Sequence, residues 1–268
     1  MTPTDIAVLT AASAAAGVMN AMAGGGTIVT FPTLLLIGEP AITANATSTV
    51  ALLPAALASM AGFRREVATH REWLRVLLLP SLLGGAIGAV LLLRTPEKAF
   101  ARLAPLLVLF ATVLFVVQGM LAQRAERRRA KSAEASLGPA SRDETPRGRW
   151  LTALLLQFLI SIYGGYFGAA IGILMLAVLG FLGLRDIFAM NGLKNFFGFC
   201  INGVAAAYFI VRGAVDWPIA LLMMAGSVAG GYGGAHFARR IGKEKARAAV
   251  VVIGLVVTAV LFWQQAGH

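Results

Sequence analysis

The sequence predicts an all-α membrane protein that crosses the bilayer repeatedly and consists of two inverted repeats with broken helices. Composition, an internal repeat and the placement of basic residues support this prediction. Hydrophobic residues make up 58% of the 268 residues and charged residues only 13%, whereas a soluble domain carries about a quarter charged residues. The charges are clustered, which leaves apolar stretches near the ~20 residues that a spanning helix requires.

The second half of the chain repeats the first at a nearly constant offset of 146 residues. Asn45 recurs as Asn191, and Gly26 recurs as Gly172. A serine and glycine block also recurs, with Ser81, Gly84, Gly85 and Gly88 matched by Ser227, Gly230, Gly231 and Gly234. Chance matching in an Ala/Gly/Leu-rich chain is the alternative, and the single shared offset disfavours it. A duplicated, glycine-rich, apolar chain is typical of secondary transporters, whose substrate site lies between the repeats.

Apolar runs between charged or turn-forming breaks give five elements per half, or about eight to ten membrane elements in all. They lie at 5–23, 27–38, 40–63, 73–93 and 99–121, and at 150–166, 168–184, 186–210, 217–237 and 246–264. Pro40 and Pro96 suit helix starts, and Asp186 suits an N-cap. We expect a first transmembrane repeat at 1–121, a polar and flexible linker at 122–149, and a second repeat at 150–268.

The element at 27–38 is too short to cross ~30 Å of hydrocarbon as one helix. Basic residues therefore decide whether the first two elements of each half cross once or twice. Two crossings give inverted repeats and place 18 Lys and Arg residues inside and 4 outside. One crossing gives parallel repeats and 13 against 9. The positive-inside rule favours the inverted arrangement.

The net charge of +11 by itself fits a nucleic-acid partner or an anionic lipid surface. In a membrane protein, cytoplasmic loops that follow the positive-inside rule explain the same excess. We therefore expect no nucleic-acid partner. We place the chain in the lipid bilayer of a bacterial inner membrane, with 122–149 in the cytoplasm. The sequence leaves a homodimer open.

The third element of each half carries the densest polar cluster. Asn45, Ser48 and Thr49 stand at i, i+3 and i+4 and share a helix face. The same positions in the second half hold Asn191, Lys194 and Asn195, and Asn202 returns to that face about three turns later. A lysine near a helix centre costs roughly 2.5–3.5 kcal/mol on insertion scales, so Lys194 should face the protein interior or water. It either counters an anionic substrate, or it snorkels to the interface or pairs with a carbonyl.

Two glycine-rich segments interrupt the apolar runs at corresponding places. The first holds Gly24, Gly25 and Gly26 and is followed by Thr27. The second holds Gly168 and Gly172 beside Tyr166. Paired broken segments indicate a transporter's binding site, since they direct helix N-termini with free N–H groups into it. For the hydroxyls, and for Asn20 nearby, bonds to neighbouring backbone are the stronger alternative.

No constellation predicts an enzyme, a cofactor or a metal site. The three histidines share no metal-ligand spacing, and no Walker loop, nucleophile elbow or zinc-protease helix is present. The Gly-x-x-x-Gly spacings at 84–88 and 226–234 are typical of closely packed membrane helices.

The two broken segments and the polar faces that follow them carry a family resemblance. Gly-Gly-Gly-Thr-Ile-Val-Thr-Phe-Pro at 24–32, then Ala-Asn-Ala-Thr-Ser at 44–48, resembles the first-repeat signature of the TauE/SafE membrane-permease family. Tyr-Phe-Gly-Ala-Ala-Ile-Gly at 166–172, then Asn-Gly-Leu-Lys-Asn at 191–195, resembles the second. Ala169 and Ala170 stand where many members have glycine. The resemblance covers nearly the whole chain apart from 122–149.

The resemblance implies outward transport of sulfur-containing anions such as sulfite and organosulfonates. The residues themselves support only a small anion. A permease for another organic anion stays an alternative, as does a non-transporting membrane assembly protein that docks partners through 122–149. The substrate site expected between the repeats comprises Lys194, Asn191, Asn195, Asn45, Ser48, Thr49, Gly24, Gly25, Gly26, Thr27, Gly168, Gly172 and Tyr166.

Overall fold

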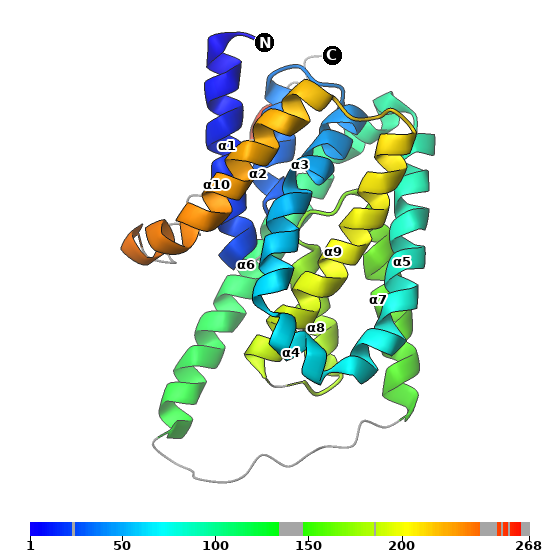
Figure 1. Cartoon of the computed structure of the whole chain (residues 1–268), viewed down its shortest axis with the longest axis vertical. Helices are drawn as coiled ribbons and strands as arrows, with labels where there is room; N and C mark the ends of the chain where they lie inside the picture. The colour runs from blue at the N-terminus through cyan, green and yellow to red at the C-terminus, as the bar shows by residue number, and fades with distance from the viewer. Residues whose placement is uncertain are drawn as a thin grey trace.

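A computed structural model describes residues 1–22, 25–133, 147–184, 186–241, 251–252, 254–256 and 258–263. Within these residues the chain is helical, without strands, which confirms the all-α fold (Figure 1). The labelled helices are α1 (Pro3–Met22), α2 (Thr27–Leu36), α3 (Ala41–Gly62), α4 (Arg64–Thr69), α5 (Arg71–Arg94), α6 (Glu97–Ala133), α7 (Arg147–Tyr166), α8 (Ile171–Phe181), α9 (Ile187–Val211) and α10 (Trp217–Ile241).

These helices match the predicted elements closely. Four stretches in the described residues are long and apolar enough to cross a membrane: α3, α5, the Glu97–Gln118 part of α6, and Phe188–Val211 of α9. Shorter apolar helices, α2 and α8 among them, fill the remaining elements. Asp186 caps α9 as predicted, because its carboxylate accepts the Phe188 N–H at 2.9 Å. The last predicted element, 246–264, lies partly outside the described residues.

Two segments differ from the sequence prediction. The expected linker at 122–149 is helical at its start, because α6 continues to Ala133, and at its end, because α7 begins at Arg147. Alanine, glutamate, glutamine and arginine dominate the sequence of the α6 extension and are strong helix formers, so the helix continues although the sequence there has no apolar periodicity. Residues 134–146 lie outside the described residues. The short helix α4 was also not predicted.

The two halves pack reciprocally. Helix α1, the first of the first half, packs against α10 of the second half. Helix α7, the first of the second half, packs against α5 of the first half. A side chain on Gly230 would lie 2.0 Å from the Ala14 carbonyl oxygen, and one on Gly165 would lie 2.0 Å from the Gly85 oxygen. Only glycine allows backbones to approach this closely, which confirms the small-residue packing faces.

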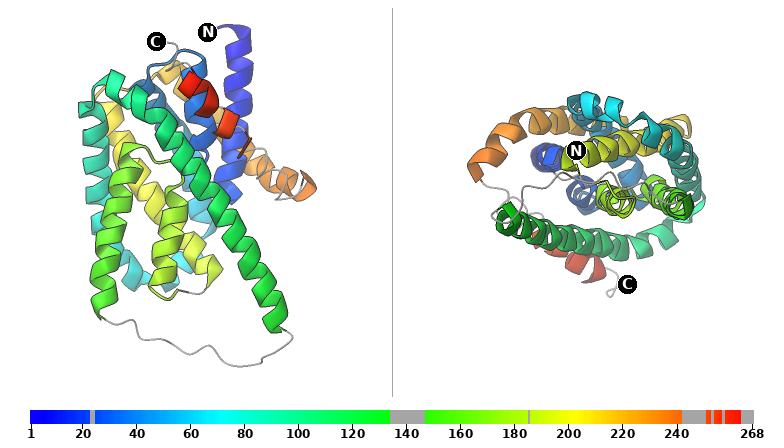
Figure 2. Two further views of the ribbon diagram at one scale, coloured as in Figure 1. Left: turned by 180° about the vertical axis from the view of Figure 1, so that it is seen from behind. Right: turned by 90° about the horizontal axis from the view of Figure 1, so that it is seen from below.

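Corresponding helices also run in opposite directions. In Figure 1, α1 and α3 descend from the top of the view, whereas α7 and α9 rise from the bottom. The long helix α6 crosses one flank obliquely (Figure 2). Inverted repeats would give this antiparallel course. The inverted orientation of the two halves in a membrane itself stays a prediction.

Candidate functional site

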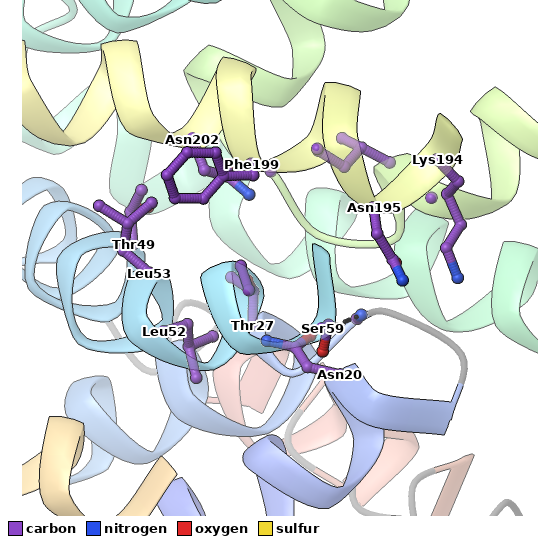
Figure 3. A pocket seen from close by; sticks show the side chains of 16 residues that line it. Asn20, Thr27, Thr49, Leu52, Leu53, Ser59, Lys194, Asn195, Phe199 and Asn202 are labelled. Atoms are coloured by element: carbon purple, nitrogen blue, oxygen red, sulfur yellow. Dashed lines mark hydrogen bonds between the residues drawn. The ribbon is translucent and has the colours of Figure 1, made fainter. Parts of the chain in front are cut away.

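A cavity lies between α3 and α9, where the two broken segments meet them. Its volume is about 70 Å³, and it is partly open to solvent. The lining residues are Asn20, Gly25, Thr27, Thr49, Leu52, Leu53, Ala56, Ser59, Gly168, Ile171, Gly172, Lys194, Asn195, Gly198, Phe199 and Asn202 (Figure 3). Those of α3 run from Thr49 to Ser59 and those of α9 from Lys194 to Asn202, and the rest come from α1, α2, α8 and the two breaks. The cavity therefore extends from the middle of α3 and α9 toward the end of the molecule that carries α4 (Figure 1).

Lys194 supplies the charge of this cavity. Its side chain is only 5% exposed, and its Nζ donates to Asn191 Oδ1 at 3.1 Å. Among the described residues that line the cavity it is the only ionisable one. Lys194 and Asn195 extend from α9 toward the side from which Asn20 and Ser59 come (Figure 3). A buried ammonium is costly unless it is paired, so the chemistry of this lining suits a small anion.

The stem of Lys194 lies across α8. A Cβ added to Gly172 would stand 3.0 Å from Lys194 Cδ, so the glycine gives the aliphatic stem its place. Ile171 and Gly172 begin α8 and line the same cavity. N–H groups in a first helical turn have no partner within the helix. The positive end of α8 therefore adds to the charge of Lys194.

The first break is held by an amide side chain. Asn20 Oδ1 accepts the N–H groups of Gly25 and Gly26 at 3.2 and 3.0 Å. Gly25 has φ +119°, which L side chains rarely adopt. Gly25 and Thr27 line the cavity, whereas Gly26 packs beneath it against Ala16. Gly24 lies outside the described residues.

The second break is held by a hydroxyl. Tyr163 donates its phenolic O–H to the carbonyl oxygen of Ala169 at 2.9 Å. Gly168 and Ala170 both have positive φ, +77° and +62°. The left-handed conformation costs an L residue such as Ala170 roughly 1–2 kcal/mol. This strained turn ends α7 and directs the start of α8 into the cavity.

Five of the predicted residues that the structure describes do not line the cavity: Gly26 and Asn191, which lie behind its lining, and Asn45, Ser48 and Tyr166. Ser48 Oγ and Thr30 Oγ1 are 2.6 Å apart and fully buried. Asn45 Nδ2 donates to the Tyr166 carbonyl oxygen at 3.0 Å. The hydroxyl of Tyr166 lies 3.3 Å from Thr95 Oγ1. Of the polar face on α3, only Thr49 lines the cavity, and Asn191 acts behind it through Lys194.

Several lining residues were weakly indicated or missed by sequence reasoning. Asn20 and Asn202 were noted only as neighbours of stronger candidates. Ser59 was missed, although Thr49, Leu52, Ala56 and Ser59 follow the helical period from one face of α3. A search for that periodicity, extended past the polar cluster, would have found it.

The family model described as "Sulfite exporter TauE/SafE" matches residues 9–261. A "Probable membrane transporter protein" of Haemophilus influenzae is 27% identical over 261 residues, which cover 97% of this chain and 95% of that protein. A protein of a Sinorhizobium species with the name "Probable membrane transporter protein ORF9" is 26% identical and covers 93% of this chain and 89% of its own length. A probable membrane transporter of Escherichia coli K12 is 22% identical over the full chain and 93% of its own length. No solved structure matches.

Proposed function

We propose that this chain, which belongs to the sulfite exporter TauE/SafE family, exports a small sulfur-containing anion such as sulfite or an organosulfonate. The family and the names of the relatives make the chain a multi-pass membrane transporter. The choice of anion and the outward direction are our proposal. Transport proceeds by alternating access, in which the cavity between the repeats opens to one side of the membrane at a time.

The buried ammonium of Lys194 is the observation that carries the proposal. This side chain of α9 lies beside the start of α8, in a cavity whose other described lining residues are neutral. A single buried positive charge favours an anion, because leaving it unpaired in a low-dielectric site is costly. The same proposal places the chain in a bacterial inner membrane, with residues 122–149 in the cytoplasm.

The neighbouring groups complete an oxyanion site. Asn195, Asn20 and Asn202 carry amide groups that donate hydrogen bonds to oxyanions. The first turn of α8 offers backbone N–H groups beside Gly172. Leu52, Leu53 and Phe199 form an apolar wall that suits the carbon portion of an organosulfonate.

Thermal stabilisation of the detergent-solubilised protein tests the substrate class. Sulfite, alkyl sulfonates, sulfoacetate and matched carboxylates are compared for their shift in melting temperature, since a ligand that binds the folded state stabilises it. We expect the sulfur anions to give the largest shift. Equal shifts for the carboxylates would overturn the choice of sulfur anion.

Replacing the cation tests the site. We expect Lys194→Ala to lower affinity for the anion about 100-fold, as the loss of a charged hydrogen-bonded pair does, and to abolish flux in reconstituted vesicles. Gln157→Ala, which removes another buried polar side chain that does not line the cavity, is the control. Undiminished flux in Lys194→Ala would exclude the assigned role.

Replacement of the linker distinguishes a transporter from a protein that docks partners. Replacing residues 134–146 by a neutral spacer of equal length should leave flux unchanged in a transporter. Loss of flux with an intact fold would instead favour the assembly role.

A further inference from the structure

A second cavity adjoins the first on the neighbouring face of α3. It lies between α3 and α10 and is lined by Ala55, Ala58, Ser59, Gly62, Phe63, Val228 and Gly231. We refer to it as the apolar groove, because Ser59 carries the only polar side chain among these lining residues. Ser59 also lines the cavity that holds Lys194, so the two spaces adjoin at this residue.

The groove forms where two helices diverge and their side chains are small. Ser227 Oγ of α10 donates to the Ala51 carbonyl oxygen of α3 at 2.9 Å and joins the helices at their crossing. Toward the C-terminal end of α3, α10 runs away from it (Figure 1). Ala55, Ala58 and Gly62 follow Ala51 at helical spacing and have too little volume to fill the widening gap. A Cβ added to Gly62 would meet no atom within 4 Å, so the space beside it is open.

The two spaces differ in size and in chemistry. The first has a volume of about 70 Å³ and is lined by the ammonium of Lys194 and three side-chain amides. The apolar groove has a volume of about 340 Å³. A water-sized group needs about 10–15 Å³ of cavity volume, so the first cavity holds about five such groups, the size of a sulfonate and its first carbon atom. The groove has room for a hydrocarbon chain.

The charged residue of the first cavity is directed toward the side where the groove adjoins. Figure 3 shows Lys194 and Asn195 extending from α9 toward the side from which Ser59 comes. An anion bound at Lys194 can therefore direct its substituent past Ser59. Transfer of a hydrocarbon chain from water into the groove is favourable in proportion to the apolar area that it buries.

We propose that the apolar groove is a subsite for the hydrocarbon chain of an amphiphilic anion whose head group binds at Lys194. The apolar wall of the first cavity takes the first carbon atoms, and the groove takes the rest of a chain of butyl to octyl length. Alkyl sulfonates are then better ligands than inorganic sulfite. This inference rests on the proposed function, because it extends the anion site at Lys194 that the proposed function requires.

Affinity as a function of chain length tests the subsite. Linear alkyl sulfonates from ethanesulfonate to octanesulfonate, and the matched carboxylates, are titrated into the full-length protein in detergent by calorimetry, below their critical micelle concentrations. We expect affinity to rise about threefold with each methylene group that enters the groove, close to the contribution of a buried CH₂. Ethanesulfonate, whose chain ends in the first cavity, gives the reference affinity.

Two glycines provide a matched pair of variants. Gly62→Leu fills the groove, whereas Gly203→Leu on α9 has an equally free Cβ but lines neither space. We expect Gly62→Leu to abolish the gain with chain length and Gly203→Leu to preserve it. Lys194→Ala should lower affinity by the same factor at every chain length, because it removes a contact of the head group only. Melting temperatures without any anion check that each variant folds, and Ala58→Leu replaces Gly62→Leu if the latter does not.

The outcomes separate the subsite from other occupants of the groove. Equal affinity at every chain length would overturn the proposal, as would a gain that persists in Gly62→Leu. Phospholipid that copurifies with the parent but not with Gly62→Leu, without a gain along the series, would assign the groove to a membrane lipid instead. Equal affinities of sulfonates and carboxylates, with the gain intact, would support the subsite and overturn only the sulfur anion of the proposed function.

Discussion

The third helices of the two repeats, α3 and α9, carry polar residues at corresponding positions, but these residues lie in different environments. Ser48 of α3 is fully buried and joined to Thr30 of α2. Its repeat mate Lys194 of α9 reaches over Gly172 into the cavity. The short side chain lets α2 pack directly on α3, whereas the long one requires a glycine on α8 and an open space. One difference between the repeated copies thus separates a packing position from a position that lines the cavity.

The two breaks differ in the same sense. Asn20 accepts N–H groups of the first break, whereas Tyr163 donates to a carbonyl of the second. Among the described residues that line the cavity, the one charged side chain, Lys194, belongs to the second repeat. The two repeats thus share an arrangement of helices and breaks but differ in the charge that they bring to the cavity.

The largest expected effect comes from making the first repeat resemble the second. Ser48→Lys buries an ammonium with no cavity beside it and displaces the bond to Thr30. We expect it to lower the free energy of unfolding by about 3–5 kcal/mol, as an uncompensated buried charge does. Thermal unfolding in detergent measures this loss. The reverse change, Lys194→Ser, should keep the fold and lose the anion-induced shift. A Ser48→Lys protein as stable as the parent would contradict the comparison.

The next largest effects are expected at Gly26 and Gly172, which occupy corresponding positions at the two breaks. Gly26→Ala places its Cβ 2.8 Å from the Ala16 backbone oxygen, which cannot yield easily, so we expect a loss of about 1–3 kcal/mol in stability. Gly172→Ala meets only the flexible stem of Lys194 and should weaken anion binding with a smaller loss of stability. Melting temperatures and anion titrations distinguish the two. Equal losses of stability would mean that both glycines serve packing alone.

Relief of strain at the second break has a smaller effect of opposite sign. Ala170 has φ +62°, which glycine adopts freely. Ala170→Gly is expected to stabilise the protein by about 1 kcal/mol, the strain removed less the added entropy of the unfolded chain. Ala169→Gly, at a position without positive φ, should give no gain. A lower melting temperature for Ala170→Gly would show that neighbouring contacts already compensate the strain.

The smallest expected effect concerns the turn between α2 and α3. Burial, and secondly the negative charge of Asp216, raise the pKa of Glu39 above its usual value. Because the folded state then binds the proton more tightly than the unfolded chain, stability gains as the pH falls through the raised pKa. Glu39→Gln should therefore melt slightly higher than the parent at neutral pH, and the difference should shrink on acidification. Parallel melting curves from pH 8 to pH 4 check this, and a constant difference would refute it.

Most of the fold could be predicted from apolar runs and the repeat. The lengths and composition of the apolar runs predict the ends of helices such as α3 and α5 to within two residues of those in the structure. The extension of α6 to Ala133 was missed because helix propensity there acts without hydrophobic periodicity. Helix α4 was missed because six residues give no periodic signal.

The site was predictable where backbone and charge define it. Lys194, Asn195 and the glycine breaks reach the cavity because a buried charge and a broken helix both require unusual surroundings. Asn45 and Ser48 were grouped with them because an offset identifies equivalent residues but not which end of the molecule is open. Their bonds to Tyr166 and Thr30 depend on tertiary contacts that spacing along one helix does not contain.

The reciprocal glycine contacts bear on how the chain is made. Helix α1 is synthesised before the helix that covers it, α10, with eight labelled helices between them in the chain. The small-residue surface at Gly17 and Ala14 must therefore wait in the nascent protein for Ser227 and Gly230. The surface of α1 stays uncovered until α10 has been synthesised, so the native pairing of these two helices forms late relative to the insertion of α1. The order of synthesis is thus a constraint on this sequence in addition to the packing of the finished fold.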